Sequence, residues 1–267
     1  MFRRILAAVL AVAVLFVPVP AQATLSAVAD PVPLKILALG DSITELHPSQ
    51  PELDWQTYLS ALLTAAGVDH VIITEATGGK RCGDFLSTSP SEVRTLADLH
   101  DPDITIIACG TNDAANGITG PGMDLTYWFM IDEAIGGHPA TRVLGTWIQY
   151  SASRPANAAA IRAGEAVVND AIYRQTIASY PYTAKYVHGA RIIGTADMQQ
   201  IPEHYLDSGG IHPTAAGYEA MARIYYNRLR LDPAYPWPDI ADPLCGLTGH
   251  RPGYGPGAYL PCTVLAT

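Results

Sequence analysis

The chain has 267 residues, of which 49% are hydrophobic and 15% charged, with a formal net charge of −9 at pH 7. One α/β domain of this size buries a large core and needs no second domain. The acidic balance argues against nucleic acid or an anionic membrane surface as the main partner, because both repel a negatively charged protein.

The first 23 residues have the pattern of a secretory signal peptide. Arg3 and Arg4 precede an unbroken apolar run from Ile5 to Val17, and Ala21-Gln22-Ala23 then offers a small-x-small cleavage site. The run is too short for a comfortable membrane span, and an uncleaved N-terminal anchor is the alternative. We therefore expect export, with a formal charge of −11 once the two arginines are removed.

Strand-like and helix-like stretches alternate from residue 35 onward. The expected strands are 35–39, 68–74, 104–109, 142–150 and 186–193. The expected helices are 55–66, about 90–100, 123–135, 157–179 and 214–229. Gly67 marks the end of the first helix, and Ser89-Pro90-Ser91-Glu92 has the form of a capping box with proline at the first helical position. Strands separated by helices indicate a parallel sheet with helices on both faces.

From Leu231 onward the chain changes character. Residues 231–267 hold seven prolines and five glycines, too many for regular structure, so we expect an extended tail wrapped on the domain. The four cysteines suit an oxidising compartment and match no zinc spacing. We favour a Cys245–Cys262 disulfide within the tail. Cys82 and Cys109 then either form a bridge, if their loops are neighbours, or leave Cys109 as a buried small hydrophobe.

The stretch Ile36–Thr44 is the most informative motif. An apolar run ends at Gly40, and Ser42 follows two residues later. A buried strand that turns sharply into a helix exposes its first polar side chain at the carboxyl edge of the sheet, where open α/β sheets bind ligands. A helix N-terminus there would also favour developing negative charge. Taken alone, Gly-x-Ser after a strand is often only a helix cap.

Two further motifs follow later strands. Gly110-Thr111-Asn112-Asp113 comes directly after the third expected strand, which puts Asn112 at the same sheet edge as Ser42. Its amide supplies uncharged N–H donors, as an oxyanion hole requires, although an Asx-type turn has the same sequence. His212 precedes Pro213 on a short loop before the last helix, where its imidazole can exchange a proton with Ser42 or lie on the surface without a role.

Together these segments resemble the SGNH/GDSL hydrolase family. Gly40-Asp41-Ser42-Ile43-Thr44 resembles its nucleophile block, Gly110-Thr111-Asn112-Asp113 its asparagine block, and Ile211-His212-Pro213-Thr214 with Gly217 its histidine block. The resemblance extends to about Leu229 and does not explain the tail. It implies a three-layer α/β/α sandwich with a five-stranded parallel sheet of the flavodoxin type, over residues 24–230. No Gly-x-Ser-x-Gly elbow is present, which disfavours the larger α/β-hydrolase fold.

The resemblance assigns roles to individual residues. Ser42 would be the nucleophile and His212 the general base. The oxyanion donors would be the backbone N–H of Ser42, the side chain of Asn112 and a glycine N–H from the loop after the second strand. In that loop Gly78 is the best match and Gly79 the alternative, because the usual Asn-x-Gly-x-x-Gly spacing is not intact.

One position departs from the family pattern. The family places an aspartate three residues before the histidine, and here that position is Gly209. The nearest acid is Asp207, which either orients the imidazole or leaves that task to a backbone carbonyl in a Ser–His dyad. Spoiling this role in a serine protease costs about 10⁴ in kcat. Asp41 and Asp113 are expected to brace their own turns rather than to react.

These features predict a secreted serine ester hydrolase that forms an acyl-Ser42 intermediate. The resemblance implies short acyl groups, such as carbohydrate O-acetyl esters, and no metal or organic cofactor. The substrate would be a small-molecule or polysaccharide ester, and we expect a monomer without stable membrane association. Two alternatives stay open: a lipase or phospholipase of the same fold, and a glycan-binding protein with an impaired site.

Overall fold

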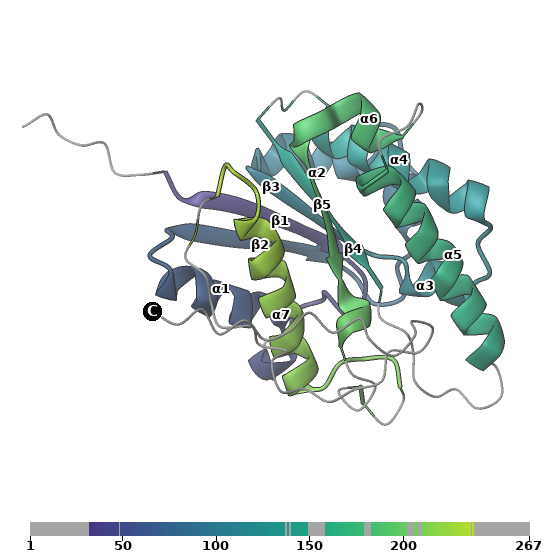
Figure 1. Ribbon diagram of the computed structural model, residues 1–267, viewed down its shortest axis with the longest axis horizontal. Coiled ribbons are helices and arrows are strands. Elements are labelled where there is room, and N and C mark those ends of the chain that lie inside the picture. Colours follow the sequence, from purple (N-terminus) through teal and green to yellow (C-terminus); the bar gives the residue numbers. More distant parts are fainter. Residues whose placement is uncertain are drawn as a thin grey trace, which may run out of the picture. The chain divides into compact units, whose positions relative to one another are not determined.

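Five parallel strands form one sheet in the computed structural model, in the order β2-β1-β3-β4-β5 (Figure 1). The structure describes residues 32–47, 49–136, 138, 140–148, 158–178, 183–201, 206–207, 210–235 and 237. The strands are β1 (Leu34–Gly40), β2 (His70–Ala76), β3 (Ile104–Ala108), β4 (Arg142–Trp147) and β5 (Ile192–Asp197). This order is the flavodoxin-like one, so the predicted fold class is confirmed.

Helices cover both faces of the sheet. They are α1 (Trp55–Ala65), α2 (Glu92–His100), α3 (Thr111–Ala115), α4 (Gly120–Ile135), α5 (Ala158–Thr176), α6 (Ala184–His188) and α7 (Ala215–Arg230), with short 3-10 helices at Pro51–Leu53, Cys82–Leu86, Gly189–Arg191 and Met198–Gln200. Helices α1 and α7 pack on one face, and α2, α4 and α5 pack on the other (Figure 1). The result is the predicted α/β/α sandwich.

The alternation of side chains along the strands builds two separate cores. In β1, Ile36 and Ala38 point to the α1–α7 face, whereas Leu37 and Leu39 point to the face that α2, α4 and α5 cover. All four are fully buried, as a parallel sheet covered on both faces requires. On the α1–α7 side the rings of Trp55 and Tyr225 lie 4.4 Å apart between their centroids and join the two helices.

Two predicted elements differ from the structure. Residues 186–193 were expected to be a strand, but Ala184–His188 is helix α6 and strand β5 begins only at Ile192. Tyr186 and Val187 are too few apolar residues to show a period that separates a helix from a strand, which explains the error. The predicted N-cap of α2 is also wrong by two residues. Ser91, not Ser89, caps the helix by accepting a hydrogen bond from the backbone N–H of Arg94. Pro90 therefore precedes the cap.

Only the start of the predicted tail is described. Tyr235 and Trp237 pack against the α1–α7 core, and the ring of Trp237 lies 5.6 Å from that of Tyr226. The rest of the tail, the predicted signal peptide at residues 1–23 and the favoured Cys245–Cys262 pairing lie outside the described residues. The domain boundaries at residues 24 and 230 stay predictions.

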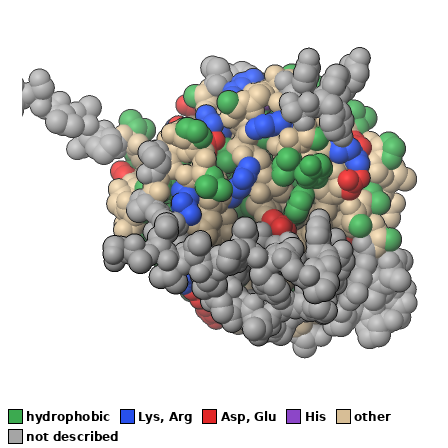
Figure 2. Space-filling model, viewed as in Figure 1, with side chains coloured by type: hydrophobic (Ala, Val, Ile, Leu, Met, Phe, Trp, Pro, Cys, Tyr) green, Lys and Arg blue, Asp and Glu red, His purple; other side chains and the backbone are tan. Residues whose placement is uncertain are grey.

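The described surface is mixed rather than uniformly polar. On the face that Figure 2 shows, exposed hydrophobic side chains form separate groups with charged side chains between them. Among the described residues, no helix combines the length and the apolar character that crossing a bilayer requires.

Candidate active site

Ser42 lies in a tight turn at the carboxyl end of β1. A Cβ added to Gly40 would lie 2.4 Å from the Cβ of Thr44 and 3.0 Å from the carbonyl oxygen of Ala108, so only glycine fits where the strand ends. The backbone N–H groups of Thr44 and Glu45 both donate to the carbonyl oxygen of Asp41, at 2.9 Å. The motif thus forms a single turn, and the expected helix directly after Ser42 is absent, since α1 begins at Trp55.

The carboxylate of Asp41 braces this turn, as predicted. Its Oδ1 accepts the backbone N–H of Ile43 at 3.0 Å, whereas Oδ2 has no hydrogen-bond partner among the described residues. Burial raises the pKa of Asp41 to about 7, and the nearby charge of Asp113 acts in the same direction. A carboxyl group placed one residue from a nucleophile is therefore kept largely neutral in slightly acidic solution.

The sheet order brings Ser42 and Asn112 to the same place. Strand β1 pairs with β2 on one side and with β3 on the other, so the chain leaves β1 and β3 in opposite directions. Open α/β sheets form their ligand crevice at such a switch point. Ser42 follows β1 there, and Asn112 lies in α3 directly after β3.

His212 meets Ser42 across 170 residues of sequence. The Oγ of Ser42 lies 2.9 Å from Nε2 of His212, within hydrogen-bond distance. The histidine loop is shaped by an antiparallel bridge between Leu206 and Pro213. After the loop, Thr214 caps α7 by accepting the backbone N–H of Gly217.

Asp207 faces the other nitrogen of the same imidazole. Its Oδ2 lies 3.7 Å from Nδ1 of His212, an ion-pair distance that is too long for a good hydrogen bond. The backbone N–H of Asp207 donates to the carbonyl oxygen of His212 at 2.7 Å, so the loop folds back on itself. The two side chains are 42% and 43% exposed, respectively, and water competes for their interaction.

Gly78 lies against the nucleophile, whereas Gly79 does not. A Cβ on Gly78 would lie 3.8 Å from the Cβ of Ser42, and nothing lies within 4 Å of the corresponding position on Gly79. The loop is attached to the nucleophile turn because the backbone N–H of Thr77 donates to the carbonyl oxygen of Gly40 at 3.3 Å. Of the two glycines, Gly78 is therefore the one that lies beside Ser42.

Sequence reasoning did not identify Glu45 as part of this site. Its Oε2 accepts the backbone N–H of Gly78 at 3.0 Å, so a carboxylate of the chain itself occupies the donor that an oxyanion would need. Glu45 lies three residues after Ser42. No family block or spacing rule marked it, because the contact depends on how the loop after β2 folds.

The amide of Asn112 is partly engaged as well. Its Nδ2 donates to the carbonyl oxygen of Lys80 at 3.0 Å. An amide nitrogen carries two hydrogens, so this bond leaves one for a ligand and fixes the direction in which it points. The ammonium group of Lys80 is turned away toward Glu92, 2.5 Å from its Oε1.

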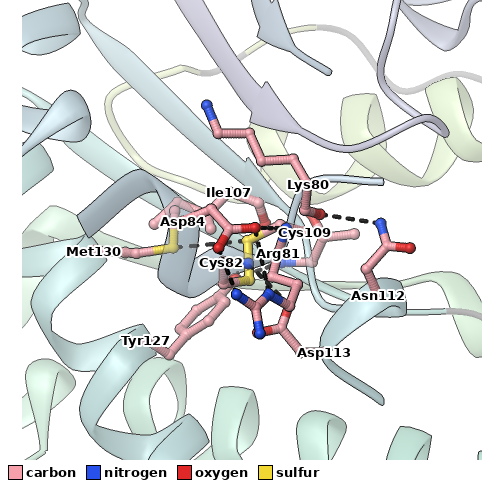
Figure 3. The surroundings of a disulfide bond; sticks show 11 residues. Lys80, Arg81, Cys82, Asp84, Ile107, Cys109, Asn112, Asp113, Tyr127 and Met130 are labelled. Carbon is pink, nitrogen blue, oxygen red and sulfur yellow. Dashed lines mark hydrogen bonds and ion pairs between the residues drawn. A yellow bond between two sulfur atoms is a disulfide. The ribbon is translucent and has the colours of Figure 1, made fainter. Parts of the chain in front are cut away.

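A disulfide joins Cys82 and Cys109, with their Cα atoms 5.4 Å apart (Figure 3). The bridged alternative is thus the one the structure shows, and Cys109 is not a free buried thiol. The backbone N–H of Cys82 also donates to Oδ2 of Asp113 at 2.8 Å. Asp113 therefore holds a neighbouring loop and does more than brace its own turn, and its burial raises its pKa.

Among the described residues, no three His, Cys, Asp or Glu side chains are grouped so that they could hold a metal ion. The groups that the structure does bring together are a hydroxyl, an imidazole, a carboxylate and N–H donors. Such a set can perform nucleophilic acyl transfer, in which the imidazole moves a proton and the donors hold an oxyanion.

Comparison with known proteins supports a family assignment. The profile of the GDSL-like lipase/acylhydrolase family matches residues 38–220. An arylesterase from Vibrio mimicus is 32% identical over 83 residues, which cover 31% of this chain and 40% of that protein. The chain thus aligns with less than half the length of that relative.

Solved structures share the fold at low sequence identity. A carbohydrate esterase family 3 structure from Talaromyces cellulolyticus is 20% identical with a TM-score of 0.56, covering 74% of this chain and 97% of that one. A Clostridium thermocellum family 3 carbohydrate esterase is 18% identical with a TM-score of 0.56, covering 75% and 100%. These likenesses establish the α/β/α fold.

Proposed function

Because this chain belongs to the GDSL-like lipase/acylhydrolase family, we propose that it hydrolyses carboxylic esters with Ser42 as nucleophile and His212 as general base. The observation that carries this proposal is the 2.9 Å separation between Oγ of Ser42 and Nε2 of His212. A hydroxyl is a weak nucleophile until a base within hydrogen-bond distance takes its proton.

The first half-reaction forms the acyl-enzyme. With the Nδ1 proton facing Asp207, Nε2 accepts the proton of Ser42 as Oγ attacks the ester carbonyl carbon. The carbonyl electron pair moves to oxygen, and the oxyanion is held by the N–H of Ser42, the N–H of Gly78 and the amide of Asn112. Collapse breaks the bond to the alcohol, which leaves with the proton from Nε2.

The second half-reaction releases the acid. Water gives a proton to Nε2 of His212 and attacks the acyl carbon, the oxyanion forms again, and collapse frees Oγ of Ser42 with return of the proton. Asp207 is proposed as the third member of a catalytic triad with Ser42 and His212. Its carboxylate lies on the Nδ1 side of the imidazolium that forms twice per cycle. Glu45 must release the N–H of Gly78 in each half-reaction.

For the substrate we propose short acyl esters, including carbohydrate O-acetyl esters. Two carbohydrate esterases among the proteins of similar fold support this choice. The competing lipase or phospholipase function requires an apolar groove for a long chain.

We also propose that the protein is exported and acts as a monomer without stable membrane association. The apolar run and cleavage site near the N-terminus support export, and the disulfide between Cys82 and Cys109 is consistent with an oxidising compartment. Sequencing the N-terminus of the exported protein tests the cleavage site near residue 23. The contact between Ser42 and His212 favours a hydrolase over the glycan-binding alternative, which predicts binding without turnover.

The test compares hydrolysis of p-nitrophenyl acetate, butyrate and octanoate by the wild type and by Ser42→Ala. We expect the acetate ester to give the highest kcat/KM and Ser42→Ala to abolish turnover and labelling by an organophosphate probe. Ser60→Ala is the matched control, because Ser60 also lies 2.8 Å from a histidine nitrogen, that of His70, away from the site. Activity that survives in Ser42→Ala would contradict the proposal, and a preference for octanoate would favour a lipase.

A further inference from the structure

Two separate loops carry the proposed oxyanion donors. Gly78 lies in the loop after β2, and Asn112 lies at the start of helix α3, directly after β3. Strand β1 separates β2 from β3 in the sheet, so no ladder of backbone hydrogen bonds links these two strands. The spacing of the two donors therefore depends on how both segments are attached at the end of β1, where Thr77 is hydrogen-bonded to Gly40, and on the contacts between the two segments themselves.

Three contacts join these loops (Figure 3). The disulfide connects Cys82 to Cys109, and the backbone N–H of Cys82 donates to Asp113 at 2.8 Å. The amide of Asn112 donates to the carbonyl oxygen of Lys80 at 3.0 Å, two residues from Gly78. Cys82 and Cys109 are fully buried, and Asp113 is 2% exposed.

Asp113 is an unexpected residue to place in this interior. Burying a carboxyl group is costly unless it is hydrogen-bonded. Here the carboxyl accepts the N–H of Cys82, which would otherwise be a buried donor without a partner in the same place. An apolar side chain at position 113 would fill the space but leave that N–H unsatisfied, so the carboxyl group holds the loop in one position.

We propose that Cys82, Cys109 and Asp113 form a cross-loop clamp that sets the separation of Gly78 and Asn112 around Ser42. This inference rests on the proposed hydrolase function. The three are positioning residues, because they act through the donors and do not touch the substrate. An oxyanion hole stabilises the transition state more than the bound ester, so a loosened clamp lowers kcat and leaves KM nearly unchanged.

The first test is Asp113→Ala beside Asp113→Asn. We expect Asp113→Ala to lower kcat by about 10²-fold, the cost of misplacing an oxyanion donor, with KM changed by less than about threefold. Asp113→Asn should retain most of the activity, because its amide oxygen can accept the same N–H of Cys82. A kcat retained in Asp113→Asn but lost in Asp113→Ala would show that the hydrogen bond to Cys82, and not the charge of Asp113, positions the donors.

The second test removes the disulfide with the double variant Cys82→Ala/Cys109→Ala. Mutation is preferable to a reductant, since both sulfur atoms are buried. We expect kcat to fall in the same direction as in Asp113→Ala. Affinity for phenylboronic acid, which forms a tetrahedral adduct on a catalytic serine, should fall in parallel, and the pH profile of kcat/KM should keep its shape because His212 is untouched.

Asp232→Ala is the matched control for lost stability. Asp232 is also buried and accepts a hydrogen bond from Nε of Arg142 at 3.0 Å, at the opposite, amino-terminal edge of the sheet. All rates are compared below the onset of thermal unfolding, followed by circular dichroism. Asp232→Ala should lower the melting temperature and leave kcat and phenylboronic acid affinity unchanged.

The outcomes separate the clamp from the function. An active wild type whose Asp113→Ala and double-cysteine variants keep their kcat and phenylboronic acid affinity would overturn the clamp alone. A wild type without ester hydrolysis and without labelling at Ser42 would overturn the proposed function. If Asp113→Ala does not fold, the double-cysteine variant alone tests the clamp. A wild-type kcat in that variant would then overturn the proposal.

Discussion

The two sides of Ser42 are built differently. On the oxyanion side, the segments that carry Gly78 and Asn112 are joined by a buried disulfide and by a hydrogen bond to a buried carboxyl group. On the histidine side, Asp207 and His212 are nearly half exposed and lie on a loop that is held mainly by its own backbone hydrogen bonds. One side is thus cross-linked through buried groups, although Gly78 itself is exposed, and on the other side both interacting side chains are open to water.

This difference matches what each side must do in the proposed reaction. Oxyanion donors stabilise charge only if they are already in position, so rigidity contributes directly to rate. The imidazole must reach first the serine hydroxyl and then the leaving alcohol, and some freedom on its loop does not hinder that exchange. Solvent also weakens the pairing of an exposed carboxylate with an imidazolium, so Asp207 should contribute less than the donors do.

The largest expected effect comes from the contact between Ser42 and His212. His212→Ala removes the general base and should lower kcat on p-nitrophenyl acetate by at least about 10⁴-fold. Stability should change little, because the side chain is half exposed. His70→Ala, which removes the other serine-paired histidine, serves as the control and should stay active. A His212→Ala variant with a tenth of wild-type kcat would refute the assignment.

Next in size is the loss of an oxyanion donor from the rigid side. Asn112→Ala should lower kcat by about 10²- to 10³-fold with little change in KM, since the amide acts on the transition state. The comparison is made with Asn227→Ala, another partly buried asparagine, whose Oδ1 accepts a hydrogen bond from Arg230. An equal loss of kcat in Asn112→Ala and Asn227→Ala would show that Asn112 acts only through the stability of the fold.

The nucleophile turn, in which Asp41 is buried, should also make the stability of the protein depend on pH. Burial raises the pKa of Asp41 from 3.8 to about 7, so between these values the folded state binds a proton that the unfolded state has lost. The free energy of unfolding therefore falls as pH rises, by about 2 kcal/mol between pH 5 and pH 7 for this group. Asp41→Asn removes this titrating group, so the free energy of unfolding, measured with urea, should depend less on pH in the variant.

Burial also raises the pKa of Asp113 in both proteins, so the profile of Asp41→Asn should be flatter than that of the wild type but not level. A variant profile as steep as the wild type between pH 5 and pH 7 would contradict the assignment to Asp41. Asp84→Asn is a suitable control, because Arg81 lowers the pKa of that exposed carboxyl group and its titration lies below the tested range.

A smaller effect is expected on the open side. Asp207→Asn should lower kcat by about tenfold, well below the ~10⁴-fold loss seen where such an acid is directly hydrogen-bonded to the imidazole. The 3.7 Å separation and the exposure of both groups are the reason. Raising the salt concentration should reduce the difference in kcat between the wild type and Asp207→Asn, because salt screens exposed charges. A loss near 10⁴-fold would show that Asp207 closes onto His212 during the reaction.

The smallest expected effect is a gain. Glu45→Gln replaces a charge-assisted hydrogen bond to the N–H of Gly78 with a neutral one, which is about half as strong, so the donor is released more readily. We expect kcat/KM to rise by about two- to threefold and inhibition by acetate to become tighter. Glu52→Gln, an equal change of charge outside the site, should do neither. A fall in activity would show that Glu45 supports the substrate instead.

Much of the fold could be predicted because its signals are local. The apolar run before Gly40, the helical spacing after Trp55 and the buried run at Ile104 each describe an element without reference to the rest of the chain. The failure at β5 has the same origin, since the short apolar stretch around Tyr186 supports a helix or a strand equally well. Local pattern identifies long elements and misplaces short ones.

The sequence by itself determined the three ordered motifs around Ser42, Asn112 and His212, because glycines at strand ends and polar residues after them are readable along the chain. Only the tertiary structure decided which glycine and which acid face these residues. Gly78 was separated from Gly79, Asp207 was placed beside His212, and Cys82 was joined to Cys109. Each of these depends on how loops from different strands meet at one sheet edge, and that meeting follows from strand order rather than from any local spacing.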